Sequence, residues 1–106
     1  MGDKVRDEAA HILVVDDDRR IRELLKSYLT TNGYRVTVAG DAKEARASMA
    51  SFEFDVLIVD VMMPGESGIE FTKSLRETSD VPVLFLSALS EAGDSIAGLA
   101  SGGDDY

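Results

Sequence analysis

Cysteine is absent from this 106-residue sequence, and His11 is its single histidine. A disulfide framework and a cysteine-ligated metal site are therefore excluded. No apolar stretch is long enough to span a membrane, and the polar start at residues 1–6 does not look like a secretory signal peptide. These absences favour a soluble cytoplasmic protein with no membrane partner.

Positive charge is also scarce, because 11 lysines and arginines face 20 aspartates and glutamates, and the formal net charge is −9. Such a surface repels the phosphate backbone of nucleic acids and anionic membranes. We therefore expect no direct binding of nucleic acid by this chain. The length suits one domain, which we place at residues 11–106, after a charged and poorly ordered tail at residues 1–10.

The rest of the sequence alternates apolar, strand-like runs with helical patterns in the order βαβαβαβα. Strands are predicted at residues 11–15, 34–39, 55–60 and 81–86. The first and third are continuously apolar, as in parallel strands covered on both faces, whereas 34–39 alternates and belongs at an edge. Right-handed crossovers then predict an α/β fold, a doubly wound parallel sheet of strand order 2-1-3-4.

The helices are marked by caps and by apolar spacing. Asp41 followed by Glu44 indicates a capping box before the second helix, and Ser67 can cap a third that runs to about residue 78. A fourth helix at residues 90–100 contains two glycines and should be weak. The first helix has apolar residues at helical spacing. These are Ile21, Leu24, Leu25, Tyr28 and Leu29.

Acidic residues close two of the predicted buried strands. Asp16, Asp17 and Asp60 should meet at the carboxyl edge of the sheet, because the first and third strands are neighbours. Clustered carboxylates resist ionisation unless a cation lies among them, and oxygen ligands without cysteine or a nearby histidine favour Mg²⁺. We assign Asp18 as the cap of the first helix. His11, at the far end of its strand, is assigned as a structural or surface residue.

A carboxylate-held Mg²⁺ suits phosphoryl transfer, in which a protein mainly positions groups and neutralises charge. Asp60 is the candidate nucleophile because it ends a central strand alone. The loop that follows contains Pro64, Gly65 and Gly68, which can bring the backbone close to a phosphate. Ser87, after the fourth strand, offers a hydroxyl to a phosphoryl oxygen.

Four motifs together carry a resemblance to a known family. They are Val14-Val15-Asp16-Asp17, Val59-Asp60-Val61-Met62-Met63-Pro64-Gly65 with Gly68, Leu86-Ser87-Ala88 and Gly103-Asp104-Asp105-Tyr106. Over residues 11–106 the sequence resembles the receiver (REC) domain of two-component system response regulators. The resemblance implies a flavodoxin-like fold and a phosphoacceptor regulatory domain rather than an enzyme.

The resemblance also implies roles for individual residues. Asp60 would accept a phosphoryl group from a phosphohistidine of a sensor histidine kinase or a phosphotransfer protein, in a His-Asp phosphorelay. Asp17, Asp60 and the backbone carbonyl of Met62 would bind Mg²⁺ directly, while Asp16 would act through a metal-bound water. Ser87 would be the switch hydroxyl and Tyr106 the switch aromatic.

Signal output is implied in the same way. The helix at residues 90–100 would shift together with Ser87 and Tyr106, and an output domain beyond Tyr106 would respond. A winged-helix segment there would imply transcription regulation.

The sequence departs from the family pattern at its end. The pattern continues past the aromatic residue to a Lys-Pro pair and a fifth helix, so we expect a domain truncated before its fifth strand and helix. It would lack one cation of the transfer site. The strand at residues 81–86 would have an open apolar edge. We therefore predict self-association or a homodimer through that edge.

Two alternatives stay open. Without the lysine, the chain is compatible with a pseudo-receiver, a binding module that acts without phosphorylation. Asp16-Asp17-Asp18 after a strand also fits the nucleophile motif of haloacid-dehalogenase-type phosphatases, which would place the covalent bond on Asp16. A change of Asp60 to Asn, followed by labelled phosphoryl incorporation from acetyl phosphate, separates the receiver interpretation from the phosphatase, whereas the pseudo-receiver depends on whether the full-length protein also lacks the lysine.

Overall fold

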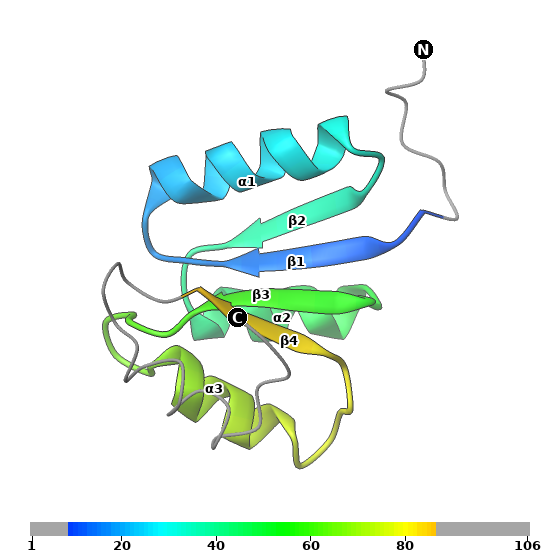
Figure 1. Ribbon diagram of the computed structural model, residues 1–106. Helices are drawn as coiled ribbons and strands as arrows, with labels where there is room; N and C mark the ends of the chain where they lie inside the picture. Colours follow the sequence, from blue (N-terminus) through cyan, green and yellow to red (C-terminus); the bar gives the residue numbers. More distant parts are fainter. Residues whose placement is uncertain (1–8, 87–106) are drawn as a thin grey trace.

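The computed structural model describes residues 9–86, and within this part four parallel strands form one sheet (Figure 1). The strand order is β2-β1-β3-β4. The strands are β1 (His11–Val15), β2 (Arg35–Ala39), β3 (Val56–Asp60) and β4 (Val83–Leu86). The predicted α/β class and the predicted order are confirmed.

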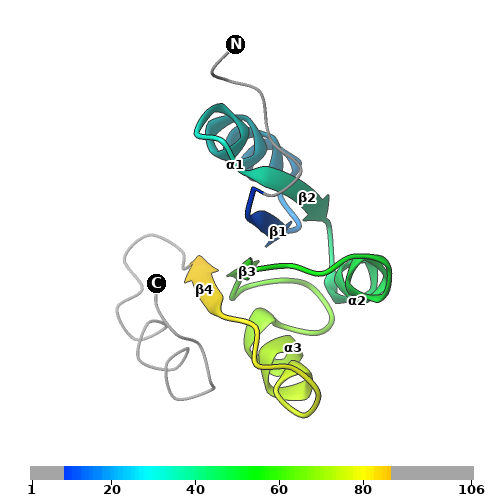
Figure 2. The same ribbon diagram turned by 90° about the vertical axis from the view of Figure 1, so that its right-hand side faces the viewer.

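Three helices connect the described strands. α1 (Arg19–Thr31) lies on one face of the sheet, and α2 (Ala42–Ser51) and α3 (Gly68–Leu75) lie on the other (Figure 2). The sheet is therefore doubly wound, as predicted. None of these helices is both long enough and apolar enough to cross a membrane.

The burial of the strands follows their places in the sheet. Every residue of β1 is buried, because β1 lies between β2 and β3. β2 is only half-buried apart from Ala39, which fits its place at the edge. The main core joins the sheet to α2 and α3. Its buried members are Leu13, Val15, Ala39, Ala42, Ala45, Leu57, Val59, Val61, Met63, Phe71, Val83 and Phe85.

The first two helices begin at the predicted aspartates. The side chain of Asp18 accepts a hydrogen bond from the backbone N–H of Arg20, and that of Asp41 accepts one from Glu44. The second hydrogen bond of the predicted capping box, to the carboxylate of Glu44, comes from a different donor. Asp41 is extended, and the Glu44 carboxylate accepts from the backbone N–H of Gly40 over 2.6 Å rather than from Asp41. Both helix starts are nevertheless satisfied.

α3 has a complete capping box, in which Ser67 and Glu70 each accept from the backbone N–H of the other. The helix ends at Leu75, before the predicted end near residue 78. The chain tightens there, because the N–H groups of Glu77 and Thr78 bond to carbonyls three residues back rather than four. Such i to i+3 bonds end an α-helix.

β4 begins at Val83, two residues later than predicted. Pro82 has no N–H to donate to a strand ladder, although its carbonyl accepts from Leu57. The N–H of Val81 bonds instead to the hydroxyl of Ser79 over 3.1 Å. Both residues therefore belong to the irregular segment between α3 and β4.

The apolar side of α1 is narrower than its sequence suggests. Ile21, Leu25 and Leu29 are half-buried, whereas Leu24 is 65% exposed and Tyr28 is exposed as well. Among the described elements α1 packs mainly on β2 and β1, and a single stripe of its side chains is half-buried against the sheet. Residues 1–8, the helix predicted at 90–100, Ser87 and Tyr106 lie outside the described residues. Self-association through the β4 edge stays a prediction.

Candidate functional site

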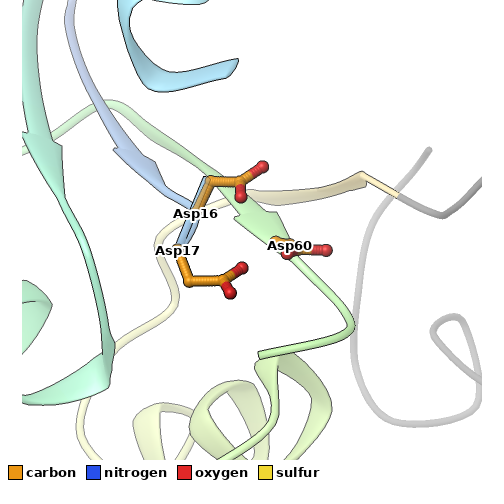
Figure 3. A group of neighbouring side chains, drawn as sticks. All are labelled: Asp16, Asp17 and Asp60. Atoms are coloured by element: carbon orange, nitrogen blue, oxygen red, sulfur yellow. The ribbon is translucent and has the colours of Figure 1, made fainter. Parts of the chain in front are cut away.

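Three carboxylates gather at the carboxyl ends of β1 and β3 (Figure 3). β1 and β3 pair in register, with Val15 opposite Val59, so the acids that follow these residues are neighbours. One oxygen from each of Asp16, Asp17 and Asp60 lies within 4.8 Å of the other two. The structure therefore brings together the three acids proposed as side-chain metal ligands, while their individual roles stay predictions.

Asp16 is the most firmly held of the three acids. It is only 5% exposed, and its carboxylate accepts a hydrogen bond from the backbone N–H of Asp18 over 2.8 Å. Its own N–H donates to the carbonyl of Ala39 on β2. The guanidinium of Arg22 donates to the Asp16 carbonyl over 2.8 Å. The backbone and the side chain of Asp16 are therefore both held by hydrogen bonds within the protein.

Asp60 ends β3 and is half-buried. Its Oδ1 accepts a hydrogen bond from the backbone N–H of Met62 over 3.1 Å. Burial raises the pKa of Asp60 to about 7; the negative charge of Asp16 and the nearby Asp17 also raise it, and the Met62 N–H opposes them. Burial likewise raises the pKa of Asp16. Asp16 and Asp60 therefore hold a negative charge poorly.

A cation among these oxygens would reverse that electrostatic cost, because it favours the ionised carboxylates. The side-chain donors are all carboxylate oxygens, which is the donor type that Mg²⁺ takes. Acidic groups are also common without a metal. The raised pKa values of two of these acids make the cluster a better candidate than an ordinary exposed group of aspartates.

The loop after Asp60 is fastened at several points. The N–H of Val61 donates to the carbonyl of Leu86, which continues the β3–β4 ladder past the acid. Gly65 has a φ of +76°, a left-handed conformation that glycine adopts without strain. Arg46 on α2 makes two hydrogen bonds of 2.7 Å to the carboxylate of Glu66. The loop is thus tied to both the sheet and α2.

Other residues singled out in the sequence also have places in the structure. Met62, whose carbonyl is a candidate ligand, has a side chain that is exposed. His11 is buried at the far end of β1, where its Nε2 and the Thr37 hydroxyl are 2.8 Å apart and its ring packs against Phe54. Burial lowers its pKa. The structural assignment of His11 is confirmed, as is Asp18 as a cap.

Two contacts of the site were missed by sequence reasoning. Arg22 was not among the residues singled out in the sequence, yet its guanidinium reaches the Asp16 carbonyl. Gly68 was noted as a loop residue and as part of a family motif, yet it packs directly on the backbone of Asp60. An arginine in the first turn of the helix after an acidic loop is the only sequence signal for the first contact. The place of Gly68 in the motif after Asp60 is the only signal for the second.

The fold and the acids define a class: a flavodoxin-like α/β domain with a carboxylate cluster at the carboxyl ends of two adjacent parallel strands. Comparison with known protein families then identifies the family of this domain. The family described as the response regulator receiver domain matches residues 12–106. The chain belongs to this family, which consists of regulatory phosphoacceptor domains of two-component systems rather than classical enzymes.

Individual relatives agree with the family assignment. The chain is 47% identical over 96 residues to Protein PetR of Rhodobacter capsulatus, covering 91% of this chain and 40% of PetR. It is 46% identical over 99 residues to response regulator MprA of Mycobacterium ulcerans, covering 92% and 43%. The chain thus spans about two fifths of the length of these curated relatives.

Solved structures of response regulators have the same fold. The receiver domain of the Francisella response regulator 1452 is 42% identical, with a TM-score of 0.83 over 92% of this chain and 81% of that one. TrrA of Thermotoga maritima, described in complex with Mg(2+)-BeF, is 36% identical, with a TM-score of 0.80 over 92% and 84%. The flavodoxin-like topology is therefore shared with both.

Proposed function

We propose that this domain is the phosphoacceptor switch of a His-Asp phosphorelay and that Asp60 carries the phosphoryl group. The observation that supports this most is the place of Asp60. It ends the central strand β3, is oriented by the Met62 N–H, and lies within 4.8 Å of two further carboxylates. A nucleophile beside oxygen ligands for a cation is what phosphoryl transfer to a carboxylate requires.

In the proposed reaction, a carboxylate oxygen of Asp60 attacks the phosphorus of a phosphohistidine. The new O–P bond makes an acyl phosphate, and the P–N bond breaks with its electron pair left on the imidazole nitrogen, which takes a proton from solvent. The Met62 N–H holds one carboxylate oxygen in place during this step. Asp60 must be ionised to attack, and its pKa of about 7 makes that ionisation dependent on its surroundings.

We propose Mg²⁺ as the cofactor, held directly by Asp17, Asp60 and the carbonyl of Met62, with Asp16 acting through a water. When bound, the ion would neutralise charge on the carboxylates and on the phosphoryl oxygens. The similar response regulator TrrA, described in complex with Mg(2+)-BeF, supports the choice of Mg²⁺, and the ligand set follows from the family resemblance. The burial of Asp16, at 5% exposure, suits an outer role better than that of a nucleophile.

The switch is proposed from the family resemblance, because Ser87 and Tyr106 lie outside the described residues. β4 ends at Leu86, which pairs with Asp60, and Ser87 is the next residue in the chain. We infer that the Ser87 hydroxyl responds to the phosphoryl group and that Tyr106 and the segment at residues 90–100 respond in turn.

The partners are also proposed from the family resemblance. The donor would be a sensor histidine kinase or a phosphotransfer protein in the cytoplasm, and the output would be a domain outside this chain. PetR and MprA are longer than the matched region, and a further relative, YrkP of Bacillus subtilis, is described as a transcriptional regulatory protein. We therefore infer transcription regulation as the output, without nucleic-acid contact by the receiver itself.

Two other functions have weaker support. A phosphatase using Asp16 would need an accessible nucleophile, but Asp16 is buried and its carboxylate is bonded to the Asp18 N–H. A pseudo-receiver would not need the acidic cluster, which this chain retains. Neither alternative explains the position of Asp60.

The test is transfer of a labelled phosphoryl group from acetyl phosphate to the 106-residue chain, with and without Mg²⁺. We expect Mg²⁺-dependent, acid-stable and base-labile label in the wild type and none in Asp60→Asn. Asp18→Asn is the matched control, because asparagine also caps a helix, and it should retain the label. Label that persists in Asp60→Asn would refute the assignment, and no label in the wild type would favour the pseudo-receiver.

A further inference from the structure

Gly68, the first residue of α3, packs directly on the backbone of the proposed phosphoacceptor. A Cβ atom at this position would overlap the carbonyl oxygen of Asp60 and lie 2.9 Å from its carbonyl carbon. The same atom would also lie 2.9 Å from a methyl group of Val59. Ordinary contacts between carbon atoms are about 3.5–4.0 Å, so no side chain fits here without movement of backbone.

The requirement for glycine at this position is one of space and not of conformation. Among the described glycines, only Gly33 and Gly65 have positive φ angles. Gly68 is buried within the first turn of a helix, where a side chain is ordinarily tolerated. The obstacle is therefore the Asp60 peptide itself, which is backbone and cannot rotate away as a flexible side chain would.

The first turn of α3 is fixed by hydrogen bonds on both sides of Gly68, one to the residue after β3 and one within the helix. The N–H of Gly68 donates to the carbonyl of Val61 over 3.1 Å. The carbonyl of Gly68 accepts from the hydroxyl of Thr72, which is fully buried. Because these bonds fix where α3 begins, an added Cβ would move either the helix or the peptide after Asp60.

We propose that Gly68 is a positioning residue for Asp60: the missing side chain lets α3 rest on the Asp60 peptide and sets the direction of the acceptor carboxylate. This proposal depends on the proposed function of Asp60. The displaced peptide would carry with it the Met62 N–H that holds Oδ1 and the Val61 N–H that bonds to Leu86. Displacements of about 1 Å near reacting groups can cost 100-fold in rate.

The experiment compares Gly68→Ala with Gly33→Ala in the full chain. Gly33 has a φ of +95° and no atom within 4 Å of an added Cβ. Its substitution therefore strains the backbone after α1 without touching the site. Three quantities are measured: hydrogen-exchange protection of the Met62 amide without metal, the dissociation constant for Mg²⁺, and the kinetics of phosphorylation by acetyl phosphate.

For Gly68→Ala we expect at least tenfold lower protection of the Met62 amide and at least tenfold weaker Mg²⁺ binding. The limiting rate of phosphorylation should fall at least tenfold, with little change in the KM for acetyl phosphate. Gly33→Ala should match the wild type in all three, even where its melting temperature is equally lowered. A folded Gly68→Ala protein that behaves like Gly33→Ala would overturn the proposal.

Thr72→Val provides a second test that keeps the shape of the side chain and removes only its bond to the Gly68 carbonyl. Thr72→Val should show the same three changes, each of about threefold rather than tenfold. If Gly68→Ala does not fold, Thr72→Val becomes the test of the proposal. Wild-type values in Thr72→Val would then reject the proposal. The wild type could also fail to be phosphorylated while Gly68→Ala still lowers the hydrogen-exchange protection of the Met62 amide. That result would reject the proposed function of Asp60 but support the role of Gly68 in positioning its carboxylate.

Discussion

The carboxylate of Asp16 accepts a hydrogen bond from the backbone N–H of Asp18 over 2.8 Å, and the carboxylate of Asp18 in turn caps α1. Two acids that are adjacent to Asp17 in the sequence thus have different tasks. Asp16 faces the cluster, and Asp18 begins the helix that follows it. The start of α1 is thereby tied to the geometry of the site.

Asp18→Ala should lower stability without disabling the site. Alanine removes the bond to the Arg20 N–H, but the backbone N–H that supports Asp16 remains. Loss of one N-cap predicts a fall of roughly 5 °C in Tm. Thermal melts and Mg²⁺ titrations of Asp18→Ala and Asp18→Asn would check this. A tenfold loss of Mg²⁺ affinity in both would show that Asp18 belongs to the site after all.

Binding of Mg²⁺ should strengthen as the pH rises through about 7. Asp60 without metal retains its proton up to that pH, and the cation must displace it. Between pH 6 and pH 8 we expect about a tenfold gain in Mg²⁺ affinity, as for competition with one proton. Titrations at fixed ionic strength measure this. An affinity that is constant over this range would mean that Asp60 is already ionised when the metal binds.

Asp60→Asn should stabilise the metal-free protein. An unfolded aspartate ionises at a pKa of about 3.9, whereas the folded one is raised to about 7. The folded state therefore binds more protons than the unfolded state between these values, so its stability falls as the pH rises through this window.

At pH 8 the asparagine variant should be more stable than the wild type by about 1 kcal/mol, a value reduced for solvent screening of a partly exposed group. Urea unfolding without Mg²⁺ measures this difference. Saturating Mg²⁺ should stabilise the wild type far more than the variant. Asp80→Asn removes an exposed carboxylate outside the cluster and serves as the control. A destabilised Asp60→Asn protein without metal would contradict the raised pKa.

Arg22→Met should weaken Mg²⁺ binding by about fivefold. The substitution keeps a long apolar side chain but removes the hydrogen bond to the Asp16 carbonyl, worth about 1 kcal/mol. Arg19→Met is the matched control, because Arg19 forms an exposed pair with Glu23 on the same helix. Equal Mg²⁺ affinity in both variants would show that Arg22 supports the fold and not the site.

Much of the fold was predictable because burial leaves a pattern in the sequence. The continuous apolar runs before Asp16 and Asp60 predicted central parallel strands, and the alternation over residues 34–39 predicted an edge strand. From that order, the meeting of the acids followed. These inferences need only the two-residue repeat of strands and the rules for crossover connections.

Other details depend on three-dimensional contacts that no repeat encodes. The early end of α3 depends on a tightened last turn, and the late start of β4 on the bonding of Val81 and Pro82. The exposure of Leu24 depends on which elements lie beside α1. The contact of Gly68 with Asp60 depends on the distance between a helix and a strand, which the residue types alone do not state.

The assignment of Asp60 as the phosphoacceptor is tested most directly by locating the phosphoryl group in the chain. After reaction with acetyl phosphate and Mg²⁺, borohydride reduction converts an aspartyl phosphate to homoserine, which peptide mass spectrometry can assign to one position. We predict homoserine at position 60 and none at position 16, 17 or 18. Homoserine at position 16, with Asp60 unchanged, would contradict it.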